Sequence, residues 1–241
     1  STGATSDAFF GVTFGTSNSA TWNLASRLQA SSTLSINFGA LSPGAHAINL
    51  SRDLSIGASG TFTKGTASTT FMGSVASTWT DATVTKQDMG IVVIDGTAKT
   101  VSFGSNVKAT NVVIGADDTL SAGSSYGISV LGNWTNDNIF TAQSGTVTFA
   151  STATGRTITP GTSSFYNLVF DGVGGNWAFN SVTATTTNDF TITNGTVTLA
   201  SGTTTVGGSF AVTSGDFMHN NGAVLFNGSA PETIAPASYS F

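Results

Sequence analysis

Few side chains in this chain could do chemistry, and the only adjacent acidic pair is Asp117-Asp118. Enzymes that cut polysaccharides use carboxylates, and glycoside hydrolysis needs two carboxyl groups about 5–9.5 Å apart. This pair lies between Gly115 and Leu120, where a turn is expected. The matching stretch in the last third of the chain, Asn194-Gly195-Thr196, carries no carboxylate. We therefore expect a solvated turn rather than a catalytic pair.

A second pattern, Gly123-Ser124-Ser125-Tyr126-Gly127, matches the G-x-S-x-G nucleophile elbow. The elbow needs a following helix, together with a His and its carboxylate partner. Here Ile128-Ser129-Val130 predicts a strand, and no His is near in the sequence. His46 and His219 fall at different places in the repeat described below, so a stacked metal ladder is not expected and both are predicted to lie at the surface. We assign no catalytic, cofactor-binding or metal-ligating residue.

Tryptophan and asparagine side chains suggest two further kinds of site, for carbohydrate stacking and for glycosylation. Trp22 and Trp177 could stack on carbohydrate, but each stands two residues before an apolar residue, Leu24 or Phe179. This period predicts that both lie in the core or at its edge, heading one column with Val101 between them. Four asparagines begin N-x-S/T sequons, which matter only if the host glycosylates asparagine: Asn49, Asn133, Asn194 and Asn227.

The composition excludes several classes of protein. Charged residues make up 8% of the chain, against about 25% in a typical soluble domain, so Ser, Thr, Asn and Gly must supply the polar surface. Seven basic residues and a net charge of −5 argue against nucleic-acid binding. Cysteine is absent, which excludes disulfides, thiol catalysis and Cys-ligated zinc. No run of about 18 apolar residues is available to span a membrane.

The secondary-structure elements that position these residues are predicted from an internal sequence repeat. Gly132–Phe165 recurs 76 residues later as Gly208–Phe241, and weaker matches at 78–80 residues extend the repeat upstream. Val147 and Phe149 recur as Val224 and Phe226. We divide the chain into the tail of a preceding unit at 1–9 and three units at 10–89, 90–165 and 166–241. Because the tail has no beginning, we expect that the chain was excised or processed from something longer.

Apolar residues two apart, separated by Ser, Thr, Gly and Asn, predict short strands with one inward face. The strands are expected to be about three to five residues long, with essentially no helix. We predict an all-β parallel β-solenoid, or β-helix, of roughly ten to twelve short coils in three tandem units. Val147 and Phe149 should point inward and stack on Leu168 and Phe170. The alternative is three tandem β-sandwiches, which normally need about 100 residues each.

Two segments carry a resemblance to a known kind of protein: GNWTNDNIFTAQSGTVTFASTATGRTITPGTSSFYNLVFDGVGGNWAFN and NDFTITNGTVTLASGTTTVGGSFAVTSGD. They resemble the repeats of very long, low-charge bacterial surface proteins, which read G-N-W-T-N, G-T-V-T-F, T-I, F-x-N-L-x-F and W. The resemblance is clear over units two and three and faint over unit one. It implies a β-helical stalk or adhesin similar to filamentous-haemagglutinin-like and autotransporter-passenger segments, and it carries no catalytic residues.

These observations together favour a non-enzymatic structural segment of an extracellular repeat protein, serving as stalk, fibre or adhesin on the surface of a bacterium or an archaeon. A carbohydrate-acting β-helix enzyme or phage tailspike is one alternative, and a carbohydrate-binding module is another. The expected partners are further repeats of the same chain or other copies joined head to tail, with cell-surface glycans as a further candidate. Matched unit ends, TITPGTSSF and TIAPASYSF, suggest that the coil closing on Phe241 needs such a cover.

Overall fold

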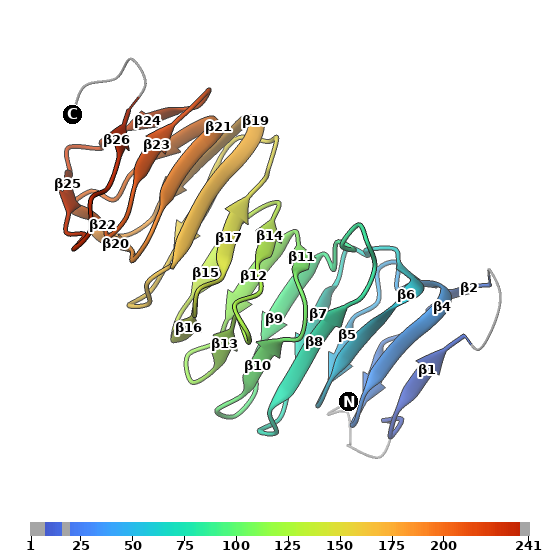
Figure 1. The fold of residues 1–241 in the computed structure, drawn as a ribbon. Coiled ribbons are helices and arrows are strands. Elements are labelled where there is room, and N and C mark those ends of the chain that lie inside the picture. The colour runs from blue at the N-terminus through green and yellow to red at the C-terminus, as the bar shows by residue number, and fades with distance from the viewer. Residues whose placement is uncertain (1–7, 16–19, 237–241) are drawn as a thin grey trace.

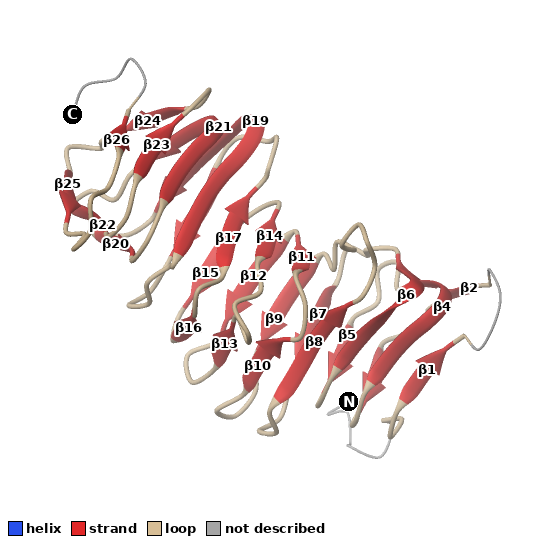
Figure 2. Cartoon of the chain, viewed as in Figure 1, coloured by secondary structure: helices blue, strands red, loops and turns tan. Residues whose placement is uncertain are grey.

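The chain winds as a parallel β-solenoid of about ten coils, which confirms the predicted fold class. The computed structural model describes residues 8–15 and 20–236. The coils stack into an elongated rod that runs from β1 to β26 (Figure 1), and the described residues contain strands and loops but no helix (Figure 2). All pairings between described strands are parallel, which excludes the tandem sandwiches.

Each coil contributes strands to three faces. The first face contains β3 (Leu28–Ala30), β5 (Ile48–Leu50), β7 (Ser68–Phe71), β9 (Ile91–Ile94), β12 (Asn111–Ile114), β15 (Trp134–Asn136), β18 (Arg156–Thr159), the second halves of β19 (Asn167–Phe179) and β21 (Phe190–Thr198), and β24 (Asp216–Met218). The second face contains β1 (Val12–Phe14), the first parts of β4 (Leu34–Ser42) and β6 (Leu54–Phe62), β8 (Ser77–Asp81), β10 (Thr100–Phe103), β13 (Thr119–Ser121), β16 (Ile139–Thr141), β20 (Thr183–Thr186), β22 (Thr203–Val206) and β25 (Ala223–Phe226). The third face contains β2 (Thr21–Asn23), the later parts of β4 and β6, β11 (Val107–Ala109), β14 (Ile128–Val130), β17 (Thr146–Phe149), the first halves of β19 and β21, β23 (Phe210–Val212) and β26 (Ile234–Ala235).

The registers show how residues stack from coil to coil. Val147 pairs with Leu168 and Phe149 with Phe170, as predicted, and all four side chains are buried. Across the second face, paired residues range from 19 apart in sequence (Val101 and Leu120) to 25 apart (Leu54 and Trp79). The coils therefore differ in loop length while the strands keep their alignment.

Stacked aromatic rings fill the core. The ring centroids of Phe149 and Phe170 lie 5.3 Å apart, those of Phe170 and Phe190 5.5 Å apart, and those of Phe190 and Phe210 5.3 Å apart. Burying a side chain of this size contributes about 1.5–3 kcal/mol. Because each coil touches only its neighbours, stability is close to a sum over adjacent coils.

Four strands are longer than the three to five residues predicted. β4, β6 and β21 span 9 residues and β19 spans 13, because each continues round a corner of the solenoid. Gly195 shows why the sequence permits this in β21. Its φ is +86°, and a Cβ built on it would lie 2.6 Å from Cζ3 of Trp177. Glycine is thus needed both for the backbone conformation and for the close approach to the indole.

The sequence repeat does not equal a whole number of coils. Val92 and Ile94 lie on the first face in β9, whereas their counterparts 76 residues later, Leu168 and Phe170, lie on the third face in β19. Between them the chain completes three coils, through β12 and β15 to β18, and then passes the second face to reach the third. Each repeat therefore makes three and two-thirds coils and moves matching strands round by one face.

Strand pairing continues across both of the proposed unit boundaries. Ser68 pairs with Ile91 across the first boundary, and Thr146 pairs with Asn167 across the second. Phe165, which closes the second unit, is buried and bridges to Thr186 in the next coil. Its counterpart Phe241 lies outside the described residues. The division into units itself stays a prediction.

Candidate functional site

The acidic pair supports a turn and does not form a catalytic pair of carboxylates. Asp117 is exposed as predicted, but Asp118 is fully buried, so the expectation of a solvated pair is wrong for Asp118. Asp118 Oδ1 accepts a hydrogen bond from Lys99 N at 2.7 Å, and Oδ2 accepts one from Gly96 N at 3.0 Å. Burial is possible because these backbone donors, one coil earlier, satisfy the carboxylate.

Lys99 is a buried base that sequence reasoning missed. Its Nζ donates to the carbonyl oxygens of Ser51 at 2.7 Å and Val75 at 2.5 Å. Burial lowers the pKa of Lys99 from its ordinary value, although the charges of Asp53 and Asp118 oppose that shift. The sequence did contain a signal, because Lys99 stands two residues before Val101 and shares its inward side of the chain.

The G-x-S-x-G pattern lies in the loop from Gly123 to Gly127, which joins β13 to β14. A strand follows it, as predicted, where the elbow would need a helix. Ser125 has a φ of +74°, and its Oγ accepts a hydrogen bond from Ser144 N at 3.2 Å. His46 is partly exposed and His219 is exposed, and the two lie in different parts of the fold. The described residues contain no group of three or more His, Asp or Glu that could hold a metal ion.

The two tryptophans do not share a column, so that prediction is wrong. Trp22 lies on the third face, Val101 on the second and Trp177 on the first. The cause is the fractional repeat, which moves matching positions to a different face. Their placement in the core or at its edge is confirmed, since Trp177 is fully buried and Trp22 is partly buried against the core.

The four sequons fall in different surroundings. Asn49 is half-buried in β5, and Asn227 is exposed after β25. Asn133 Oδ1 accepts a hydrogen bond from Thr157 N at 3.0 Å, and Asn194 Nδ2 donates to Asp171 Oδ1 at 2.7 Å. Two of the four amides thus take part in contacts between neighbouring coils, and glycosylation stays a prediction at all four.

Polar side chains at one corner of the solenoid join successive coils. Asn167 Oδ1 accepts from Asp189 N at 3.3 Å, Asp189 Oδ1 accepts from Ser209 N at 2.9 Å, and Ser209 Oγ accepts from Thr233 N at 3.2 Å. In each bond a side chain satisfies a backbone donor one coil later. These amide, acid and hydroxyl side chains therefore help to hold neighbouring coils together.

One surface hollow combines several polar groups, and we call it the trough. It has a volume of about 350 Å³ and crosses the outer side of β11, β14 and β17. Its lining is Lys86, Asn106, Val107, Ser125, Gly127, Ile128, Ser129, Thr146 and Thr148. The strands present alternate residues outward, so Ser129 and Thr148 are partly exposed while Ile128 and Val147 are buried.

The loop of residues 82–88 places Lys86 at the trough. This loop takes up the third face between β6 and β11, where Asp88 bridges to Lys108. The buried Asp81 holds the loop, because its carboxylate accepts hydrogen bonds from Thr83 N at 2.9 Å and Gln87 N at 2.6 Å. Sequence reasoning missed this loop, although unit one is the longest of the three units.

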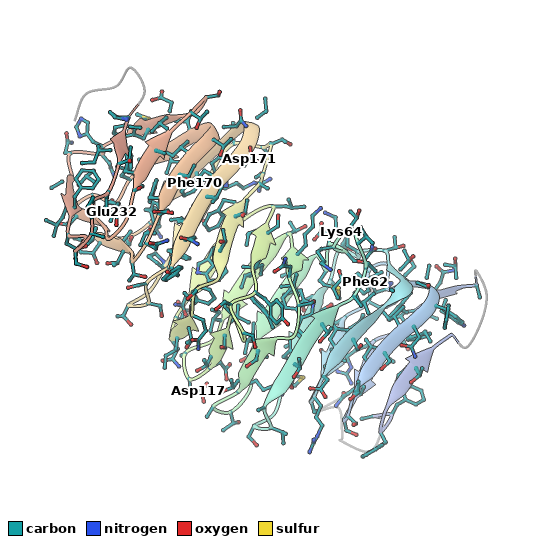
Figure 3. The ribbon with its side chains drawn as sticks, viewed as in Figure 1. Phe62, Lys64, Asp117, Phe170, Asp171 and Glu232 are labelled. Carbon is teal, nitrogen blue, oxygen red and sulfur yellow. The ribbon has the colours of Figure 1, made fainter. Side chains whose placement is uncertain are left out.

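Asp88 holds the far end of the same loop. Burial raises the pKa of Asp88, but hydrogen bonds from Lys64, Gly90 and Thr110 outweigh that effect and leave the pKa of the carboxyl below its ordinary value. Lys64 Nζ lies 2.7 Å from Asp88 Oδ2. Lys64 and the exposed Asp117 lie at opposite edges of the solenoid (Figure 3).

The chain matches no known family, no curated protein and no solved structure in comparisons of each kind. In the described part of the chain, no helix is long and apolar enough to cross a membrane.

Proposed function

We propose that the chain is a non-enzymatic structural segment of an extracellular repeat protein, serving as stalk, fibre or adhesin at a cell surface. The observation that carries the proposal is that the buried charged groups form hydrogen bonds inside the solenoid itself. Asp81, Lys99 and Asp118 are each satisfied by hydrogen bonds within one coil or to the one or two coils before it. Charged groups that stabilise stacking suit a long rod, and the resemblance of units two and three to bacterial surface repeats supports the same assignment.

The arrangement of the acids supports a role without catalysis. A polysaccharide hydrolase needs two carboxyl groups about 5–9.5 Å apart around an open site. Asp118 instead binds backbone amides of the turn that precedes β10, and Asp117 Oδ2 accepts a hydrogen bond from Ala98 N at 3.1 Å in the same turn. Both carboxylates are therefore part of the support of one corner.

The proposal includes contacts with further repeats of the chain or with other copies of it. Near the two ends of the described solenoid, apolar side chains at positions that are buried in the neighbouring coil are exposed: Phe9, which bridges to the buried Ala30, by 62%, and Ile234, which pairs with the buried Phe210, by 48%. Edge strands of a parallel sheet can pair with further strands. We propose that further repeats or another copy of the chain cover these coils, joined head to tail in a contact that propagates.

The location is tested by labelling intact cells of the source organism with antibodies raised against the chain. We expect labelling without permeabilisation, and its restriction to permeabilised cells would contradict the proposal.

The absence of catalysis is tested with a panel of surface polysaccharides. No reducing ends or unsaturated products should form. Turnover that is lost in the variant carrying both Asp117→Asn and Asp118→Asn would overturn the non-enzymatic assignment.

Self-association is tested by sedimentation over a range of concentrations. We expect species larger than the 24.3 kDa chain that increase with concentration. A single 24.3 kDa species at every concentration would count against the head-to-tail contact between copies.

A further inference from the structure

The basic residues are unevenly placed. The chain has only seven Lys and Arg residues, yet Lys64, Lys86 and Lys108 all adjoin the loop of residues 82–88. Lys64 forms an ion pair with Asp88, the backbone of Asp88 forms a parallel β-bridge to Lys108, and Lys86 lines the trough. Asp81 and Asp88 belong to the same region, so the lysines outnumber the acids there by one, in a chain with a net charge of −5.

We propose that the trough binds an anionic sugar residue of a polysaccharide, with Lys86 facing the acidic group and the hydroxyl and amide side chains facing the sugar hydroxyls. The inference goes beyond the structural role proposed above, because it stands whether or not the chain forms part of a fibre. Charge complementarity selects the ligand, since Lys86 is the only charged residue that lines the trough.

Lys86 is held in place before any ligand arrives. Its Nζ donates to the carbonyl oxygens of Asp81 at 2.8 Å and Thr83 at 2.5 Å. An ammonium group has three N–H donors, so one is left for a ligand oxygen beyond these two. The side chain is half-buried, so little of its rotational freedom is left to lose on binding.

The acids near Lys86 are already engaged. The carboxylate of Asp81 accepts hydrogen bonds from the backbone of its own loop, and that of Asp88 is bonded by Lys64 and Thr110. Neither acid lines the trough.

The remaining polar lining suits a sugar chain. Hydroxyl groups come from Ser125, Ser129, Thr146 and Thr148, and Asn106 contributes an amide. These residues belong to three successive coils, which extend over about 10 Å along the rod, a length that accommodates a disaccharide. No aromatic ring is among the lining residues, so the trough lacks the apolar platform that would favour a neutral sugar.

The repeat supplies an internal reference for this surface. Strands β11, β14 and β17 correspond to β20, β22 and β25 in the next repeat. The shift is eleven positions around the solenoid when a strand that spans two faces counts twice and the crossing at Phe165 counts once. At the outward positions, Thr148 becomes Leu225 and Asn106 becomes Thr183. Stacking therefore does not require the hydroxyl of Thr148, whereas Oδ1 of Asn106 accepts a hydrogen bond from Gly127 N at 2.8 Å and so also joins two coils.

The test is binding of the intact chain to three immobilised polymers, a polyuronate, a sulfated dextran and neutral dextran, with dissociation constants then measured by calorimetry. We expect retention by an acidic polymer, no retention by neutral dextran, and weaker binding as salt is raised. Lys86→Gln should weaken binding at least about tenfold, because it removes a charged hydrogen-bond donor. Its matched control is Arg27→Gln, which changes the net charge equally at an exposed residue elsewhere on the rod.

Because Lys86 also holds its loop, Thr148→Asp provides an independent second variant. It places a negative charge on the floor of the trough and should abolish retention, whereas Thr135→Asp, at an outward position of the first face, should not. Retention by the polyuronate assigns the charge to a carboxylate, and retention by sulfated dextran alone assigns it to a sulfate. Equal retention by neutral dextran, no retention at all, or equal losses in Lys86→Gln and Arg27→Gln would overturn the proposal.

Discussion

The trough and its repeat counterpart share a backbone plan but present different surfaces. Strands β11, β14 and β17 pair in parallel on the third face, and β20, β22 and β25 pair in parallel on the second. The inward residues of the last strand agree, since Val147 and Phe149 recur as Val224 and Phe226. The outward residue between them changes from Thr148 to Leu225. Stacking thus fixes the inward positions and leaves the outward ones free to vary.

A second difference lies beside the two surfaces. The trough is bordered by the loop of residues 82–88, which interrupts the stacking of strands on the third face. Before β20, the chain reaches the second face through Phe165, whose bridge to Thr186 continues the pairing. Asp88 forms a single bridge of the same kind to Lys108, so the two regions differ in the loop itself, which brings Lys86 to the trough.

The largest expected effect tests the shared core. Phe149→Ala should lower the free energy of unfolding by about 3–5 kcal/mol, because Phe149 is fully buried and the stacked row cannot collapse onto the cavity. Phe226→Ala should cost less, since Phe226 is only partly buried. Denaturant titration measures both values. A larger loss of unfolding free energy for Phe226→Ala than for Phe149→Ala would contradict the expected difference between these two inward positions.

The next effect tests the floor of the trough. Gly127 corresponds to Thr203 in β22, and a Cβ added at Gly127 would lie 3.0 Å from Thr146 O. Gly127→Thr should therefore destabilise the chain by about 1 kcal/mol and fill part of the trough, so that binding of the acidic polymer is lost. The reverse change, Thr203→Gly, should cost about 0.5–1 kcal/mol through added backbone freedom. Unchanged binding of the acidic polymer by the Gly127→Thr variant would show that Gly127 is not part of the binding site.

A smaller effect tests the outward positions directly. Thr148→Leu gives the trough the residue of its counterpart, and Leu225→Thr does the opposite. Both should change the free energy of unfolding by less than about 0.5 kcal/mol, as surface substitutions usually do. Thr148→Leu should nevertheless weaken binding of the acidic polymer several-fold. Unchanged binding would show that the hydroxyl of Thr148 makes no contact with the ligand.

The smallest effect concerns the loop beside the trough. The pKa of Asp88 is lowered from its ordinary value of 3.8, so the folded state is stabilised above that pH and loses this stabilisation as the pH falls through the folded pKa. Lys64→Gln should reduce the loss by roughly 0.2–0.4 kcal/mol, because Lys64 is half-exposed. Unfolding measured from pH 6 to pH 2 checks the sign. A steeper acid loss in Lys64→Gln would contradict it.

The fold was predictable because burial follows a period of two. The pairs Val147/Phe149 and Leu168/Phe170 identify inward faces and their stacking partners without any knowledge of loops. The face on which a residue lies was not predictable in this way, as Trp22 and Trp177 show. That property depends on how many corners separate two strands, and corners can be replaced by a continuous strand at a glycine such as Gly195.

The polar residues were less predictable than the apolar ones. Asp118 looks like a surface residue in the sequence, but it is buried because amides of the preceding coil satisfy its carboxylate. Those partners lie 19 and 22 residues away, and no local pattern indicates them. The trough likewise depends on three coils and an added loop, so its residues do not form a motif along the chain.

The repeat of three and two-thirds coils has a consequence for any longer chain built from such units. If each unit filled whole coils, every copy of a surface feature would lie along one line, and a rod resting on its other sides would hide them all. Here each copy points one-third of a circle away from the previous one. Every third unit returns to the same direction, after eleven coils or about 50 Å. Whichever side of such a rod lies against a surface, some copies of each feature are directed toward that surface.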